Sequence, residues 1–85
     1  MANILIVDDE PSYRQLLSLV FEEQGNVIRT AMNGRQALDL LRDESADIII
    51  SSVKMSDMDG IELLRSVREP HPDIGIVLMT AIASV

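Results

Sequence analysis

The sequence predicts an α/β fold in which helices flank an open, parallel β-sheet. Two observations carry this prediction. Four short runs of aliphatic and β-branched residues alternate along the chain with three segments whose apolar residues recur at helical spacing. The runs are continuous rather than alternating, which is typical of parallel strands buried on both faces. Right-handed crossovers would then connect the strands in the order β-α-β-α-β-α-β.

Most of the expected elements have a recognisable beginning or end. The first helix is expected to begin at Pro11, because proline suits the first helical turn, and to stop at Gly25. A second helix follows the turn at Asn33 and Gly34, and a third covers residues 61–68 before a proline-rich stop. Strands are expected at residues 3–7, 27–30, 47–53 and 74–80.

The composition excludes several kinds of protein. Seven basic and 14 acidic residues give a net charge of −7, which repels nucleic acid and anionic membranes. The chain has no cysteine, so disulfides, thiolate zinc sites and cysteine nucleophiles are excluded. The N-terminus lacks the basic region of a signal peptide, and the most apolar stretch, residues 74–85, is shorter than the roughly 20 residues that span a bilayer. We therefore expect a cytoplasmic protein with no membrane and no direct nucleic-acid contact.

Ligands of open α/β sheets bind beyond the carboxyl ends of the strands, so the residues there are candidates for function. Asp8 and Asp9 follow the first expected strand, Ser52 and Lys54 lie at the end of the third, and Thr80 ends the fourth. Neither a glycine-rich dinucleotide motif nor a phosphate-binding loop of the P-loop type is present. The functional hypothesis therefore depends on these five residues.

The adjacent carboxylates of Asp8 and Asp9 have two interpretations. They repel each other, and Mg²⁺ with its preference for oxygen ligands would relieve that repulsion. Alternatively, they cap the helix that begins at Pro11. Asp9 or Glu10 is expected near that cap, with Glu10 otherwise solvated. The role of Thr80 also has two interpretations. It could hydrogen-bond a phosphate-like oxygen, or it could simply be a β-branched residue at a strand end.

The two serines of the third strand interrupt an aliphatic run. One of them is expected to face the rim, which is the surface formed by the carboxyl ends of the strands. A serine nucleophile needs a base, but the one histidine, His71, lies between two prolines far along the chain. A Ser-His-Asp triad is therefore not expected, and neither is a phosphodonor histidine. Met55 and Met58 are expected to pack within their loop.

Four motifs occur in a fixed order along the chain, at residues 4–11, 33–38, 52–60 and 77–81. They resemble those of response-regulator receiver domains of two-component signalling, and the overall sequence is most similar to NtrC-type transcriptional regulators. The resemblance implies a flavodoxin-like sheet with strand order 2-1-3-4, in which residues 1–85 form one receiver domain truncated before its fifth β-α unit.

The resemblance also implies a chemistry and a partner. In that family a sensor histidine kinase transfers a phosphoryl group to an aspartate at the end of strand three, beside Mg²⁺. Asp8, Asp9 and the backbone carbonyl of Lys54 correspond to metal ligands, and Thr80 corresponds to the switch residue. The acceptor position, however, holds Ser52.

Further departures concern the phosphorylation loop and the fifth strand. Ser56 stands where proline is usual, and Lys54 is the one lysine of the chain, in a different loop from the lysine that the family uses. A serine hydroxyl would give a stable ester instead of a labile acyl phosphate. We therefore expect weak or absent Mg²⁺ binding, no phosphorylation by the usual route, no enzymatic activity, and action through protein–protein contact.

The expected truncation has physical consequences. Without a fifth strand, residues 74–79 form an apolar, uncharged edge, and the sheet face beside the first helix is partly uncovered. A two-fold homodimer that covers this edge or exchanges an element is the simplest solution. The apolar ending at residues 81–85 alternatively indicates a fragment of a longer chain.

Two other functions stay open. One is an Mg²⁺-dependent phosphohydrolase of the haloacid-dehalogenase type, in which Glu10, two residues after Asp8, would be the second acid. That class also uses a downstream lysine partner, and Lys54, in the loop after the third strand, is not expected to take that role. The other is a structural dimerisation module without phosphate chemistry.

Overall fold

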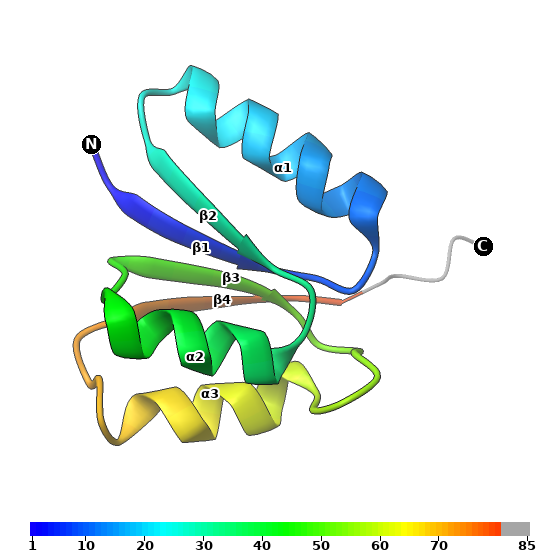
Figure 1. Ribbon diagram of the computed structural model, residues 1–85, viewed down its shortest axis with the longest axis vertical. Coiled ribbons are helices and arrows are strands. Elements are labelled where there is room, and N and C mark those ends of the chain that lie inside the picture. Colours follow the sequence, from blue (N-terminus) through cyan, green and yellow to red (C-terminus); the bar gives the residue numbers. More distant parts are fainter. Residues whose placement is uncertain (81–85) are drawn as a thin grey trace.

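The computed structural model describes residues 1–80, which form one parallel sheet with helices on both faces (Figure 1). Its elements are β1 (Asn3–Val7), α1 (Pro11–Glu23), β2 (Val27–Ala31), α2 (Gly34–Asp43), β3 (Ile48–Ser52), α3 (Gly60–Arg68) and β4 (Gly75–Met79). The strand order is β2-β1-β3-β4, and every pairing is parallel. The predicted α/β class and strand order are therefore confirmed, with element bounds within a few residues of those expected. The apolar ending at residues 81–85 lies outside the described residues.

The helices divide unequally between the two faces of the sheet. In Figure 1, α1 lies alone on one side, while α2 and α3 lie together on the other. The longest of the three, α1, has 13 residues. Among residues 1–80, no helix is both long and apolar enough to cross a membrane.

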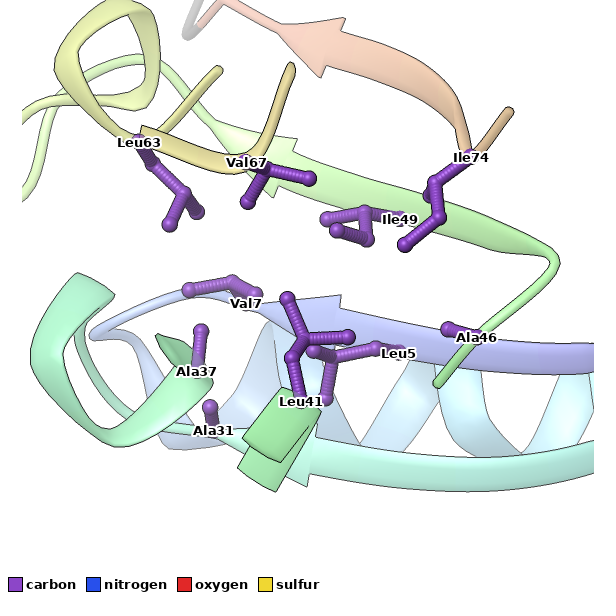
Figure 2. Packing of buried hydrophobic residues seen from close by; sticks show 10 residues of the cluster. All are labelled: Leu5, Val7, Ala31, Ala37, Leu41, Ala46, Ile49, Leu63, Val67 and Ile74. Atoms are coloured by element: carbon purple, nitrogen blue, oxygen red, sulfur yellow. The ribbon is translucent and has the colours of Figure 1, made fainter. Parts of the chain in front are cut away.

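The main core fills the space between the sheet and the pair α2 and α3 (Figure 2). Strands β1, β2 and β3 and helices α2 and α3 all contribute aliphatic side chains to it. Leu5, Val7 and Ile49 are completely buried. Full burial of one such side chain stabilises the fold by about 1.5–3 kcal/mol. The cluster consists of Leu5, Val7, Ala31, Ala37, Leu41, Ala46, Ile49, Leu63, Val67 and Ile74.

The second core, on the α1 face, is smaller. Its buried members are Ile4, Ile6 and Ile50, and α1 contacts it through the partly buried Leu17 and Phe21. No residue of α1 is fully buried. On the same face Val77 of β4, which pairs with Ile50, has 51% of its surface exposed. In the described part of the chain, this side of the sheet is thus incompletely covered.

The helix ends follow the sequence signals closely. Gly25 follows α1 with a φ of 89°, the left-handed conformation that glycine adopts most easily. Asn33 caps α2 by accepting a hydrogen bond from the backbone N–H of Gln36 at 2.8 Å, and Asp59 caps α3 by accepting one from Glu62 at 2.8 Å. These caps fix where the loops after β2 and β3 must enter their helices.

Gly60, the first residue of α3, closes the loop that follows β3. Its N–H donates to the carbonyl of Val53 at 2.7 Å. A Cβ atom at this position would lie 2.5 Å from the carbonyl oxygen of Ser52 and 3.0 Å from the Cα of Val53. Both neighbours are backbone atoms, so the loop itself would have to move to accommodate a side chain.

We expect the substitution Gly60→Ala to destabilise the fold by about 1–3 kcal/mol, the usual cost of overpacking. Urea unfolding monitored by circular dichroism measures this loss. Gly75→Ala is the matched control, because its Cβ would meet only ordinary contacts at 3.7 and 3.8 Å. Equal unfolding midpoints for the two variants would contradict the steric argument.

Candidate functional site at the carboxyl ends of the strands

A hollow of about 640 Å³ lies beyond the carboxyl ends of β1, β3 and β4. The five residues that the sequence singles out all line it, although they come from three separate parts of the chain. Register explains this, because Val7 pairs with Ser51 and Ser52 pairs with Met79, so the ends of these strands are level. The lining residues are Asp8, Asp9, Glu10, Tyr13, Ser52, Lys54, Met79 and Thr80.

Asp8 is buried at the back of this rim. Its N–H donates to the carbonyl of Ala31 at 3.1 Å, so Asp8 still continues the β1–β2 ladder. Its Oδ1 accepts a hydrogen bond from the N–H of Glu10 at 2.9 Å, which turns the chain into α1. Asp9, in contrast, is exposed.

The interpretation of Asp8 and Asp9 as the cap of α1 is wrong. The N-cap is Glu10, whose Oε1 accepts a hydrogen bond from the N–H of Ser12 at 3.4 Å. The physical reason is that residue 10 is the N-cap position of a helix that begins at Pro11, while Asp8 still belongs to the β1–β2 ladder. Glu10, one of the two residues expected near the cap, takes this position and is also exposed.

Arg14 is a rim residue that the sequence pattern does not single out. Its Nη1 donates to the backbone carbonyl of Asp8 at 2.7 Å, which ties α1 to the end of β1. Arg14 is the one basic residue of α1, and that isolated charge beside an acidic turn is the signal that could have indicated it. Its guanidinium brings positive charge next to the acidic pair.

The two serines of β3 have different environments, as the alternation of side chains along a strand requires. Ser51 is completely buried and its Oγ donates to the carbonyl of Ser52 at 2.9 Å. Ser52 faces the hollow, and its Oγ donates to the carbonyl of Lys54 at 3.1 Å. His71 precedes β4 at the amino ends of the strands, whereas Ser52 lies at their carboxyl ends, so no serine–histidine pair forms.

The rim supplies only part of a magnesium site. Mg²⁺ prefers about six oxygen ligands, including retained waters. Asp8, Asp9 and the carbonyl of Lys54 can offer oxygens, but Ser52 brings no carboxylate and its hydroxyl already donates to the Lys54 carbonyl. Within residues 1–80, no three His, Cys, Asp or Glu side chains are grouped so that they could hold a metal ion. The residues present therefore do not fit a complete magnesium site.

Thr80 is the last described residue on this rim. It is exposed and directly follows β4 at the edge of the hollow. Its hydroxyl is thus available to a ligand, while the remainder of the motif that begins at Val77 extends into residues outside the described part.

Asp57 is a second residue that the sequence pattern does not single out. It lies in the loop between β3 and α3, and its carboxylate accepts hydrogen bonds from the N–H groups of Gly34 at 3.2 Å and Arg35 at 3.1 Å. Although burial alone would raise the pKa of the Asp57 carboxyl, the backbone N–H groups of Arg35, Met58 and Gly34 hold it below the ordinary value of 3.8. No helical or strand periodicity marks such a contact, because its partners are 22 and 23 residues away.

Comparison with known proteins identifies the family. The family model that describes the response regulator receiver domain matches residues 4–85 of this chain. The chain belongs to this family. The receiver domain is 43% identical over 82 residues to the regulatory protein AtoC of Escherichia coli, covering 96% of this chain and 18% of AtoC. It is 33% identical over 79 residues to the DNA-binding transcriptional regulator NtrC of Proteus hauseri, covering 93% of this chain and 17% of NtrC.

Solved structures agree with this assignment. The chemotaxis protein CheY4 of Vibrio cholerae superposes with a TM-score of 0.92 at 36% identity, covering 99% of this chain and 72% of CheY4. The response regulator TrrA of Thermotoga maritima, solved in complex with Mg²⁺ and BeF, superposes with a TM-score of 0.91 at 37% identity, covering 98% and 72%. The receiver domain thus has the flavodoxin-like fold and is a module of phosphorelay signalling. It spans less than a fifth of the length of AtoC and NtrC.

We expect Asp57→Asn to destabilise the receiver domain by about 0.5–1 kcal/mol at pH 7, because the amide offers one acceptor oxygen instead of two. A carboxyl whose pKa is lowered by folding stabilises the fold above its unfolded pKa, and that stabilisation is lost as pH falls through the folded pKa. The difference between variant and parent should therefore shrink below pH 3.8, the ordinary value for this carboxyl. Urea unfolding at neutral and acidic pH measures it.

Asp73→Asn is the control, since it removes the same charge from an exposed turn before β4. A pH-independent difference for Asp57→Asn would contradict the role of the ionised carboxylate.

Proposed function

We propose that this receiver domain is a signalling module that does not accept a phosphoryl group by the usual route and acts through protein–protein contact. The observation that carries the proposal is the Ser52 hydroxyl, which stands at the end of β3, faces the hollow and donates to the carbonyl of Lys54. By resemblance, this is the acceptor position of the family, where an aspartate is usual.

The chemistry of the side chain supports this proposal. An aspartate attacks phosphorus as a carboxylate and gives an acyl phosphate that hydrolyses readily. The Ser52 hydroxyl is almost fully protonated at neutral pH and needs a base to become a nucleophile. One carboxylate oxygen of Asp8 already accepts from the N–H of Glu10, and the one lysine of the chain, Lys54, belongs to the loop after β3. A phosphoserine formed here would be a stable ester and a poor transient signal.

Weak Mg²⁺ binding is part of the same proposal. The relative TrrA was solved with Mg²⁺ and BeF, and the corresponding oxygens here would come from Asp8, Asp9 and the Lys54 carbonyl. Two carboxylates and one hydrogen-bonded carbonyl attract the ion less than three carboxylates would. Thr80 would be the switch residue, as the resemblance implies.

A sensor histidine kinase is the proposed protein partner, as for the family. The relatives AtoC and NtrC are named as regulators, NtrC as a DNA-binding one, and this chain matches less than a fifth of each. With a net charge of −7, the receiver domain itself is unsuited to contact nucleic acid, so we assign any such contact to another part of a longer protein. A non-enzymatic, cytoplasmic role follows from this proposal. The phosphohydrolase alternative gains no support, because Glu10 already caps α1.

Incubation with a small acyl-phosphate donor and Mg²⁺ tests the proposal. We expect no mass gain for the parent. Ser52→Asp should gain one phosphate that hydroxylamine removes, and should bind Mg²⁺ roughly tenfold more tightly, because it adds a third carboxylate. Mass spectrometry and magnesium titration by calorimetry are the measurements.

Ser56→Asp is the matched control, because it adds the same charge to an exposed position in the same loop. A stable mass gain of one phosphate at Ser52 of the parent would overturn the proposal. Equal Mg²⁺ affinities for the two variants would show that net charge, and not the position of residue 52, determines binding.

We further propose that two copies associate through β4. This strand pairs only with β3 among the described residues, and its sequence, Gly75–Met79, has no charged side chain. The carbonyl of Met79 and the N–H of Gly75 bond towards β3, so alternation turns the backbone groups of Ile76 and Leu78 towards the open edge. Such an edge is a template for another strand, and the exposed Val77 lies beside it.

Light scattering coupled to size-exclusion chromatography over a range of concentrations tests this association. We expect a dimer for the parent and a monomer for Val77→Lys, because a lysine on an edge strand opposes strand pairing. Val27→Lys is the matched control, since Val27 is 46% exposed on β2 at the other edge of the sheet. A folded, monomeric parent would refute association through β4.

A further inference from the structure

The loop of residues 53–59 connects the rim to α2 as well as to α3. At its beginning, the Oγ of Ser52 donates to the Lys54 carbonyl at 3.1 Å. At its base, the N–H of Gly60 donates to the Val53 carbonyl at 2.7 Å. In between, Asp57 and Met58 contact the start of α2. The loop is therefore held at three places by groups of this chain alone.

The contact with α2 satisfies backbone donors that a helix start leaves without a partner. The helix cap Asn33 accepts only from Gln36 with its side chain. The carboxylate of Asp57 takes the two preceding donors, Gly34 with Oδ1 and Arg35 with Oδ2. Capping of this helix is thus shared between its own cap residue and a residue of the loop after β3.

Packing reinforces these hydrogen bonds. A Cβ atom at Gly34 would overlap the Cγ of Met58 and lie 2.7 Å from its Sδ, so the absence of a side chain at Gly34 allows the loop to lie directly on the helix. Met55 and Met58 both pack against the main core, and this contact holds the loop on the body of the domain. The expectation was packing within the loop, whereas both methionines pack on the main core and Met58 also reaches α2.

We propose that Asp57 is a positioning residue that couples the start of α2 to the rim. By holding the loop on α2, it fixes the Lys54 carbonyl and the Ser52 hydroxyl that donates to it. A change at either end is then transmitted to the other through a loop of seven residues, 53–59. The inference concerns loop geometry and holds whether or not the rim takes up a phosphoryl group or a metal ion.

Native-state amide hydrogen exchange of the full chain, followed by NMR, tests the coupling. In Asp57→Ala, we expect the amides of Gly34 and Arg35 to exchange about tenfold faster, because their acceptor is lost. The decisive readout is remote. The amide of Gly60 should also exchange faster, and the amide resonance of Lys54 should shift, while amides of β1 keep the rates of the parent.

Asp73→Ala is the control and should change none of these amides. Faster exchange at Gly34 and Arg35 with no change at Gly60 and Lys54 would reduce Asp57 to a local cap and overturn the proposal. If all amides of Asp57→Ala exchange rapidly, the variant is unfolded, and Asp57→Asn is then used to test the coupling. It keeps one acceptor oxygen, and we expect smaller changes at the same four amides, whereas changes confined to α2 would again overturn the proposal.

Coupling must also operate in the reverse direction, because linkage between two sites is reciprocal. Ser52→Ala removes the hydroxyl that donates to the Lys54 carbonyl, without touching α2. We expect faster exchange at Gly34 and Arg35 in this variant. Exchange at the parent rate at both amides would contradict the coupling.

Discussion

Strand β1 lies between β2 and β3, and its side chains are buried on both faces of the sheet. Leu5 and Val7 face the larger core, whereas Ile4 and Ile6 face α1. The positions of the other strands depend on this one, because their registers are set directly or through β3 against it. The end of β1 therefore determines the rim: pairing that continues through Asp8 places its carboxylate beside Ser52.

Much of this arrangement could be predicted from the sequence. Continuous aliphatic runs and helical spacing gave the fold class, and the ends of the strands indicated Asp8, Asp9, Ser52, Lys54 and Thr80 as neighbours. Local patterns carry this information, because a parallel sheet brings all carboxyl ends to one edge. Resemblance to receiver domains gave the strand order, which periodicity alone does not determine.

Two features of the site depend on contacts that no local pattern encodes, and a third was left open by the sequence. Glu10, one of the two residues expected near the cap, is the N-cap of α1, and the acidic pair is not, because the ladder of β1 extends through Asp8. Arg14 reaches back to a backbone carbonyl. Asp57 binds a helix more than 20 residues away, where Met58 also packs against Gly34. Such contacts follow from the fold, so they could be seen only once the elements were placed.

The chain is poor in aromatic residues, and this has a consequence at the rim. The chain contains one tyrosine and no tryptophan, and Tyr13 lines the hollow with 58% of its surface exposed. Excitation of the protein near 280 nm therefore produces tyrosine emission from this site alone. The receiver domain thus carries an intrinsic fluorophore within its candidate site, and unlabelled protein reports ligand binding or loop movement there without interference from the rest of the molecule.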